Sequence, residues 1–201
     1  MEHIITESMD LTTRRIVRDV IKIVRSGEEG SWNLPSDLTG EDYYKEDLYV
    51  FFDWNMNWNE SDQKYFVDGN YDDDTETMAI TLFINKDYYP QSLYDLIADL
   101  NDIVRHEYEH HYQNIGLRPD DEYFDGEDED QPKDWTYYLQ PHEIPAVIQG
   151  IRRVMKLRGV SFEDALDGWY VRNVSDIIPK KDYEQLKEKL TDLYYSRYGK
   201  K

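Results

Sequence analysis

The chain has 201 residues, a formal net charge of −20 at pH 7 and no cysteine. An excess of carboxylates repels phosphates, so we expect no nucleic-acid partner. No apolar run approaches the roughly 20 residues of a membrane-spanning helix, so we expect no membrane partner, and the lack of cysteine excludes disulfides and thiolate zinc sites.

A chain of this length fits one domain, spanning residues 1–201. We predict an α+β fold in three parts: an N-terminal helix and loop over residues 1–46, a small, twisted, mainly antiparallel sheet over residues 47–86, and a helical part over residues 91–201. Residues 1–5 have neither the basic nor the apolar region of a signal peptide, so we expect a cytoplasmic protein.

The first half of the chain predicts one helix and several strands. Residues 11–24 have helical spacing of apolar side chains, and residues 27–40 are rich in turn formers. Alternation predicts a half-buried strand over residues 50–58, and residues 64–67 are its expected hairpin partner, with a turn at Asp68 and Gly69. The acidic run over residues 68–76 is expected to be a solvated turn, and residues 78–84 alternate as a further strand.

The next predicted helix begins at Ser92, whose spacing to Asp95 is that of a capping box. Its apolar stripe consists of Leu93, Leu96, Ile97, Leu100, Ile103 and Val104. Polar residues continue this stripe, with Glu107 and His111 near its centre. Buried polar groups cost free energy unless they are paired or coordinated, so this end of the helix indicates a site. The alternative is a helix that leaves the core at Arg105 and ends in solvated charge.

The remainder of the chain is predicted to be mostly helical. Residues 120–134 are expected to form an exposed acidic loop between two helices. The second of these helices is expected to start near Pro141, with an apolar face made by Glu143, Ala146, Val147, Gly150, Ile151 and Val154. Ser161 is expected to cap a short helix, and the last helix carries Leu186, Leu190, Leu193 and Tyr194.

The segment from His106 to His110 reads HEYEH, and histidines four residues apart lie on one face of a helix. Two imidazoles can therefore bind one metal ion, and Glu107 lies beside it, where its carboxylate can take a proton from a bound water. This HExxH pattern is typical of zinc metallopeptidases, so we expect a Zn²⁺ cofactor bound by His106 and His110. Iron, nickel or manganese can occupy the same ligands.

A catalytic zinc usually takes three protein ligands and keeps one position for water. Glu143 is the favoured third ligand, because it begins the apolar face of a helix that can pack on the HExxH helix. One rival is His142, whose direction on a helix differs from that of Glu143 by about 100°. The other is His111, whose five-residue spacing from His106 is poor for sharing a metal on a straight helix.

The combination of His106, Glu107, His110 and Glu143 resembles the gluzincin branch of the zincin metallopeptidases. Residues 137–146, with the pattern Pro-x-Glu-x-x-Ala, also look like a helix start in small, mostly uncharacterised, phage-encoded metallopeptidase-like proteins. The resemblance covers roughly residues 91–155. It implies a zincin-like fold, in which a small sheet packs on the HExxH helix and further helices follow. A phage origin would place the protein in a host cytoplasm or a virion.

The resemblance implies hydrolysis of a peptide or protein substrate, with a zinc-activated water and Glu107 as general base. Zinc and one further donor would hold the oxyanion. Tyr138 and His142 are our candidates, and Tyr137 and Tyr170 are also open. Zincin-like enzymes bind substrate as an added strand at the upper edge of the sheet, and residues 78–84 are the expected edge strand.

Two other functions stay open. The first is a non-catalytic zincin-like structural or interaction protein of a phage, which binds metal structurally or not at all. The presence of Glu107 argues against it, because a purely structural site has no use for a base. The second is an acidic mimic of nucleic acid, which needs carboxylates spaced along one elongated surface. Aromatic-rich strands and a buried HExxH motif do not favour that function.

Overall fold

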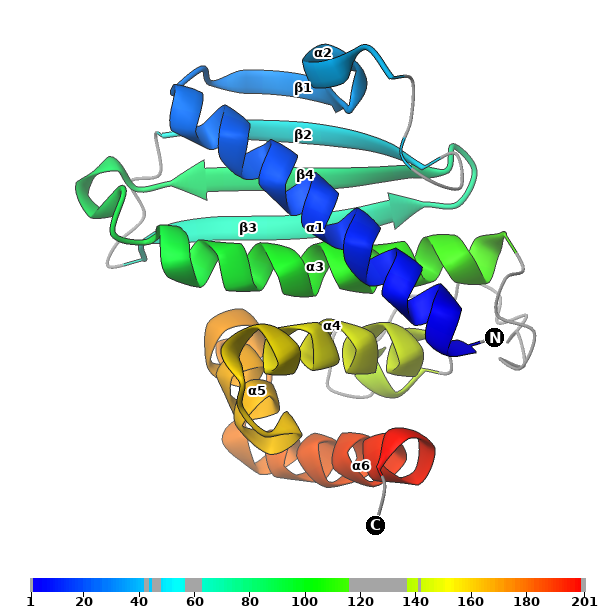
Figure 1. Ribbon diagram of the computed structural model, residues 1–201. Helices are drawn as coiled ribbons and strands as arrows, with labels where there is room; N and C mark the ends of the chain where they lie inside the picture. Colours follow the sequence, from blue (N-terminus) through cyan, green and yellow to red (C-terminus); the bar gives the residue numbers. More distant parts are fainter. Residues whose placement is uncertain are drawn as a thin grey trace.

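The computed structural model of the protein describes residues 2–41, 44, 48–56, 63–115, 137–140 and 142–199, with side chains from Met9 onward. Its fold is a mixed α+β arrangement, as the sequence predicts (Figure 1). In chain order the elements are α1 (Glu2–Ser26), β1 (Gly30–Leu34), α2 (Ser36–Thr39), β2 (Tyr49–Asn55), β3 (Tyr65–Asp72), β4 (Thr77–Ile84), η2 (Lys86–Tyr88), α3 (Leu93–Asn114), η3 (Tyr137–Leu139), α4 (Glu143–Arg158), α5 (Phe162–Trp169), the π-helical turn η4 (Tyr170–Val174) and α6 (Lys180–Tyr198).

The four strands form one mixed sheet in the order β1-β2-β4-β3 (Figure 1). The pairs β1–β2 and β3–β4 are antiparallel, but the central pair β2–β4 is parallel. A parallel pair needs a longer connection than a tight turn. Here that connection contains β3, which therefore lies at the edge of the sheet. The predicted mainly antiparallel sheet is confirmed only in part.

The sheet extends outside the predicted range of residues 47–86. Strand β1 lies within the segment that the sequence assigned to turns, and it pairs with β2 along its whole length. Only five residues long, it is bounded by Gly30 and Pro35, which are turn formers. A strand this short gives too few alternations to stand out from its flanking turn residues.

The hairpin predicted between residues 50–58 and 64–67 is wrong. Strand β3 continues through Asp68 and Gly69, pairs with β4 rather than β2, and turns only at residues 73–76. Gly69 serves another purpose, because a Cβ at this position would lie 2.3 Å from Cγ2 of Ile103. The glycine lets β3 approach α3 closely, so its presence does not signal a turn. The acidic run over residues 68–76 is accordingly strand at first and turn only at its end.

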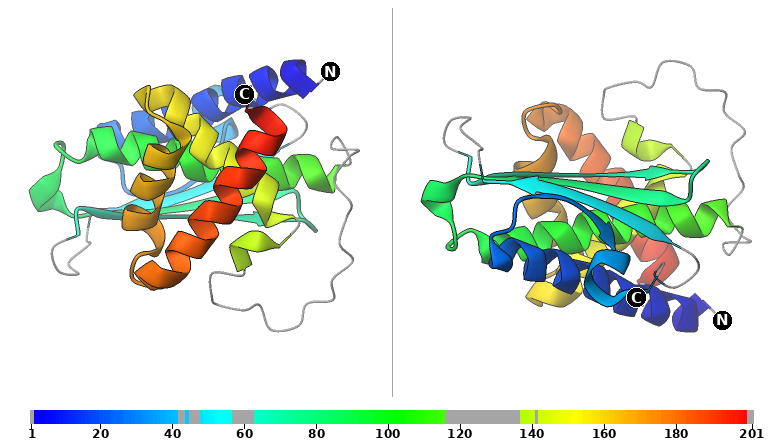
Figure 2. Two further views of the ribbon diagram at one scale, coloured as in Figure 1. Left: turned by 90° about the horizontal axis from the view of Figure 1, so that it is seen from below. Right: turned by 90° about the horizontal axis from the view of Figure 1, so that it is seen from above.

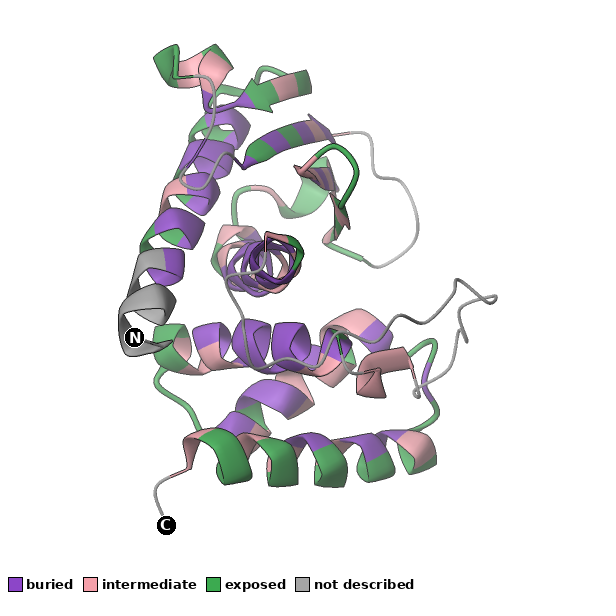
Figure 3. Cartoon of the chain, turned by 90° about the vertical axis from the view of Figure 1, so that its right-hand side faces the viewer, coloured by how far each residue is buried: buried purple, intermediate pink, exposed green. Residues whose placement is uncertain are grey.

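The predicted strand at residues 78–84 is confirmed as β4, but it is not an edge strand, because it lies between β2 and β3. Its side chains alternate between buried and half-buried positions. The buried set covers the same face of the sheet as Val50, Phe52 and Trp54 of β2. Helices α1 and α3 pack on this face and complete a hydrophobic core with it (Figure 2, Figure 3).

A second hydrophobic core joins the C-terminal helices. It contains Val147, Ile151 and Val154 of α4, together with Phe162, Leu166, Leu186 and Leu190 of α5 and α6. Helix α3 lies between the two cores, with α1 and β3 on one side and α4 on the other (Figure 1, Figure 3). Residues at the contact between α3 and α4 therefore link the two halves of the molecule.

The predicted helices are confirmed, with differences at their ends. Helix α1 starts earlier than residue 11, and Ser92 precedes α3 without capping it, because its buried hydroxyl has no hydrogen-bond partner. Ser161 does cap α5 by accepting a hydrogen bond from the Asp164 amide. No helix among the described residues has the length and apolar content to cross a bilayer. The predicted strand residues 57–58, the loop 120–134 and Pro141 lie outside the described residues.

Candidate metal centre

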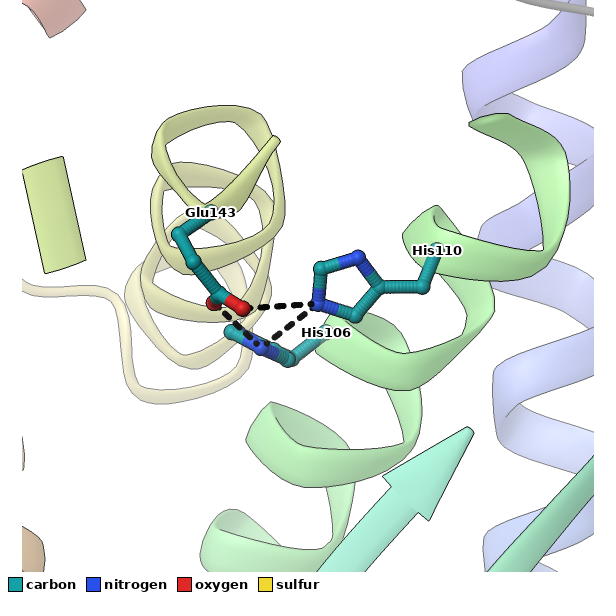
Figure 4. Close-up of side chains that lie close together, drawn as sticks. All are labelled: His106, His110 and Glu143. Atoms are coloured by element: carbon teal, nitrogen blue, oxygen red, sulfur yellow. Dashed lines mark hydrogen bonds and ion pairs between the residues drawn. The ribbon is translucent and has the colours of Figure 1, made fainter. Parts of the chain in front are cut away.

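Two helices bring three potential metal ligands together. His106 and His110 lie on one face of α3, and Glu143 is the first residue of α4. Their ligand atoms all lie within 4.8 Å of one another (Figure 4). The two Nε2 atoms are 3.1 Å apart, and the carboxylate oxygens of Glu143 lie 3.3 Å from Nε2 of His106 and 3.6 Å from that of His110. The structure thus places side by side the three ligands that the sequence favours.

The electrostatics of the three side chains fit a cation between them. Burial by itself would lower the pKa of His106, but Glu143 and Glu107 outweigh it and raise this pKa to about 9. Burial would raise the pKa of Glu143, but the imidazoles of His106, His110 and His142 hold it well below its usual range. The buried Oε2 of Glu143 accepts no hydrogen bond. This donor set suits Zn²⁺, which binds imidazole nitrogen and carboxylate oxygen.

Gln113 orients two parts of the site. Its Oε1 lies 3.1 Å from Nδ1 of His110, and its Nε2 donates a 2.9 Å hydrogen bond to the carbonyl of His142. The amide oxygen Oε1 of Gln113 can only accept a hydrogen bond. Its contact with His110 therefore places the His110 proton on Nδ1 and leaves Nε2 free to bind a metal. Gln113 lies outside the HExxH motif, but its position three residues after His110 puts both on one helix face and could have indicated this role.

Tyr137 holds the carboxylate of Glu143. Its hydroxyl donates a 2.5 Å hydrogen bond to Oε1 of Glu143. Burial, followed by the charge of Glu143, raises the pKa of Tyr137, so this phenol stays protonated and remains a donor. Tyr137 was one of several tyrosines open as oxyanion donors, but the structure directs its hydroxyl to Glu143, a candidate metal ligand.

Glu107, the expected base, lies beside the three ligands and is not one of them. Its Oε1 is 4.0 Å from Nε2 of His106. Burial raises the pKa of Glu107, and the opposing effect of His106 and His110 does not cancel it. A Cβ at Gly69 of β3 would lie 3.1 Å from Cγ of Glu107. The carboxylate therefore sits between the metal ligands and the edge strand of the sheet.

The two rival ligands have different positions. His142 precedes α4, and its Nε2 lies 3.5 Å from Oε1 of Glu143. It is the N-cap residue of α4, and its ring centroid lies 6.1 Å from that of His110. His111 is buried elsewhere, with its Nδ1 3.0 Å from the Tyr71 hydroxyl and its ring stacked on Tyr108.

The remaining candidate oxyanion donors, Tyr138 and Tyr170, lie in different parts of the structure. Tyr138 lines the cleft next to the site, and its ring packs edge-on against Trp169. Tyr170 donates its hydroxyl to the carbonyl of Ile178 and stacks on Tyr183. Tyr170 is therefore used in packing the C-terminal helices, whereas Tyr138 stays a candidate.

A cleft of about 820 Å³ opens beside the metal-binding side chains. Its floor is one face of α3 that ends at His106 and Glu107. One wall is formed by residues 63–69, mostly from β3, and the other by η3 together with residues at the end of α5 and in η4. The cleft thus joins the expected base to the free edge of the sheet.

Comparisons with known proteins were made at the level of families, curated proteins and solved structures. None of the three gave a match to this chain. The function is therefore argued from the chemistry of the residues themselves, and the likeness to gluzincins rests on four residues and one helix start.

Proposed function

We propose that the protein is a zinc-dependent peptidase of gluzincin type, which hydrolyses peptide bonds in a peptide or protein substrate. The observation that supports this most is that His106, His110 and Glu143 lie close together, next to the buried Glu107, which is not one of the three candidate ligands. A site with only a structural role would need the three ligands but not a base. The opening of this site into a cleft supports access by a substrate.

In the proposed reaction His106, His110 and Glu143 hold the zinc ion. Bound zinc would supply Lewis acidity, lowering the pKa of water to about 7 and polarising the scissile carbonyl. Glu107 takes the proton of the attacking water and passes it to the leaving amine. The raised pKa of Glu107 suits the first step, because it makes this carboxylate a stronger base than an ordinary carboxylate.

The substrate would bind along β3 and not along β4. Among the described strands, β3 pairs only with β4, and its residues line one wall of the cleft. An extended peptide can therefore add to it as a further strand, using main-chain hydrogen bonds. Gly69 brings this edge close to Glu107, so a peptide bound there would pass the base.

The oxyanion donors in this proposal are His142 and Tyr138. The side chain of His142 is 46% exposed and stands next to Glu143, so it can turn toward a bound carbonyl. Tyr138 lines the cleft, and burial raises the pKa of its hydroxyl, which keeps it a donor. A positioned donor of this kind contributes about 10²–10³ in rate.

Metal content and hydrolysis together test the proposal. Protein purified without added metal should contain close to one zinc per chain, and Glu143→Ala should lose most of it. Glu107→Gln should keep the zinc but hydrolyse a mixture of unfolded protein fragments about 10²–10⁴ times more slowly. An exposed substitution on α6, Glu188→Gln, is the matched control and should change neither quantity.

The outcomes separate the alternatives. Zinc bound by the wild type without hydrolysis of any fragment would replace the peptidase with a non-catalytic metal protein. No transition metal in the wild type, even after zinc is offered, would end the zinc proposal altogether. Zinc kept by Glu143→Ala would instead assign the third ligand to His142 or another group.

A further inference from the structure

The floor of the cleft carries negative charge that its walls do not neutralise. Asp95, Asp99 and Asp102 follow one face of α3 toward the metal ligands, and all three line the cleft. Asp95 pairs with Lys64 across the cleft at 3.6 Å, and Asp99 forms an ion pair with Arg172. Lys64 and Arg172 are therefore engaged, and neither pairs with Asp102. The third cationic group of the cleft, the imidazole of His106, pairs with Glu143 at 3.3 Å.

Asp102 is a buried carboxylate without a partner. It is 4% exposed, lies one helical turn before His106, and forms no hydrogen bond or ion pair with any described residue. Gly150 of α4 makes room for it, since a Cβ there would lie 2.2 Å from Oδ1 of Asp102. Burial, reinforced by Asp99, raises the pKa of Asp102 to about 7. An unpaired buried carboxylate costs free energy that a cationic ligand would recover.

The walls of the cleft carry further acidic side chains. Asp68 on one wall and Asp176 on the other are exposed acids that pair with no cation among the described residues. Beside Asp176, the side chains of Val171 and Ile177 are 67% and 60% exposed. Carboxylates next to an apolar wall suit a ligand group with an aliphatic stem and a charged end.

We propose that the cleft binds a cationic group of the peptide next to the bond that is cut, and that Asp102 is the specificity-determining residue that pairs with it. This inference rests on the proposed peptidase function. Two sources share this chemistry: the side chain of a lysine or arginine, and a free N-terminal amine. A group bound by Asp102 would lie within one helical turn of His106, which sets it close to the scissile bond.

Equilibrium binding tests the inference without requiring turnover. The full chain carrying Glu107→Gln is titrated, with and without zinc, with four synthetic alanine-based peptides. One has an acetylated N-terminus and a central lysine, and its partner has norleucine in place of the lysine. The other two have a free N-terminus with and without the lysine. We expect a cationic peptide to bind about ten times more tightly than its neutral partner, an effect typical of one buried charge pair.

The variants assign that preference to one residue. Asp102→Asn, added to Glu107→Gln, should reduce the ratio of affinities to nearly one. Asp192→Asn, which removes the same charge from an exposed position on α6, should leave the ratio unchanged. A difference in affinity between the two acetylated peptides identifies the lysine side chain as the bound cation. A difference between the two lysine-free peptides identifies the N-terminal amine.

Other results would overturn the inference. The inference would be overturned if the protein with native Asp102 bound cationic and neutral peptides equally. It would also be overturned if the preference survived in Asp102→Asn. If Asp102→Asn weakens zinc binding but not the preference, Asp102 positions His106 and does not bind substrate. Failure of every peptide to bind would remove the peptide-binding function as well, whereas loss of the preference alone leaves that function intact.

A second variant covers the case in which Asp102→Asn does not fold. Asp102→Ala removes the carboxylate without placing any new group next to Gly150, and it should also reduce the ratio of affinities to nearly one. A preference for the lysine peptide that survives in Asp102→Ala would contradict a role for this charge.

Discussion

At the scale of single residues, groups next to the ligands decide how the ligands are presented. The hydroxyl of Tyr137 fixes one oxygen of Glu143, and the amide of Gln113 fixes the tautomer of His110. Such outer partners typically change metal affinity by about 10–100-fold when removed. The contact of Gln113 with His110 follows from their three-residue spacing on α3, whereas the contact of Tyr137 with Glu143 depends on how η3 lies against α4.

Tyr137→Phe tests this arrangement. Removing the 2.5 Å hydrogen bond to Glu143 should weaken zinc binding about tenfold or more, because the carboxylate loses the group that orients it. Affinity is measured by competition with a chromophoric chelator. Tyr138→Phe is the matched control, since no described residue accepts a hydrogen bond from its hydroxyl, and it should keep the wild-type affinity. Equal affinities for both variants would show that the Tyr137 contact does not position Glu143.

At the scale of elements, the contact between α3 and α4 sets the site. Gly150 lies against Asp102, so the two helices approach closely one turn before His106. Pro145 is the third residue of α4, where the missing amide hydrogen has no helical partner in any case. The close approach brings Glu143, at the start of α4, to the histidines of α3.

Gly150→Ala should therefore disturb both stability and the site. The added methyl would lie 2.2 Å from Oδ1 and 3.0 Å from the carbonyl oxygen of Asp102, which forces the helices apart. Overpacking of this kind costs about 1–3 kcal/mol, more than the ~0.5–1 kcal/mol that alanine gains over glycine in a helix. Urea denaturation measures the change in the free energy of unfolding.

Gly168→Ala on α5 is the matched substitution. Its added methyl would meet only the end of the Arg172 side chain, at 2.7 Å from Nη1, and that end can move. Its free energy of unfolding should stay within about 1 kcal/mol of the wild type. If Gly150→Ala proved as stable as Gly168→Ala, the contact between α3 and α4 would be looser than the structure indicates.

At the scale of the whole molecule, the candidate metal site links two hydrophobic cores. His106 and His110 belong to a helix of the sheet-containing core, and Glu143 belongs to α4, a helix of the second core. A ligand that binds only the folded state stabilises that state. Zinc would therefore join the two halves. Without zinc, the ion pair between protonated His106 and Glu143 takes part of that role.

This predicts an unusual pH dependence for the metal-free protein. The pKa of His106 is about 9 in the folded chain, above the ordinary value of about 6.5. Protonated His106 therefore stabilises the fold fully below about pH 6.5, and this contribution is lost as the pH rises through about 9. In chelator, the free energy of unfolding in urea should fall by about 1–3 kcal/mol over that interval.

The zinc-loaded protein is the control for this measurement. Its histidines are neutral at both pH values because the metal replaces the proton, so the decline should be absent. A metal-free protein that is equally stable at about pH 6.5 and above about pH 9 would mean that protonated His106 does not form a stabilising ion pair with Glu143.

Periodicity in the sequence was sufficient to predict the longer local elements. Helices α3 and α4, strand β4 and the face of α3 that carries the motif all follow from the spacing of apolar residues. The grouping of His106, His110 and Glu143 was predictable too, because metal chemistry needs particular residue types and a four-residue spacing puts two of them on one helix face.

Only the tertiary structure decided how strands and neighbours are arranged. Pairing in a sheet joins residues far apart in the chain, so the parallel pair β2–β4 and the edge position of β3 leave no local signal. The same holds for Gly69, which meets a helix and not a turn, and for Tyr137 and Asp102, whose environments come from other elements. The spacing of residues in the sequence determines which side chains lie on one face of a helix. The packing between elements determines which residues that face contacts.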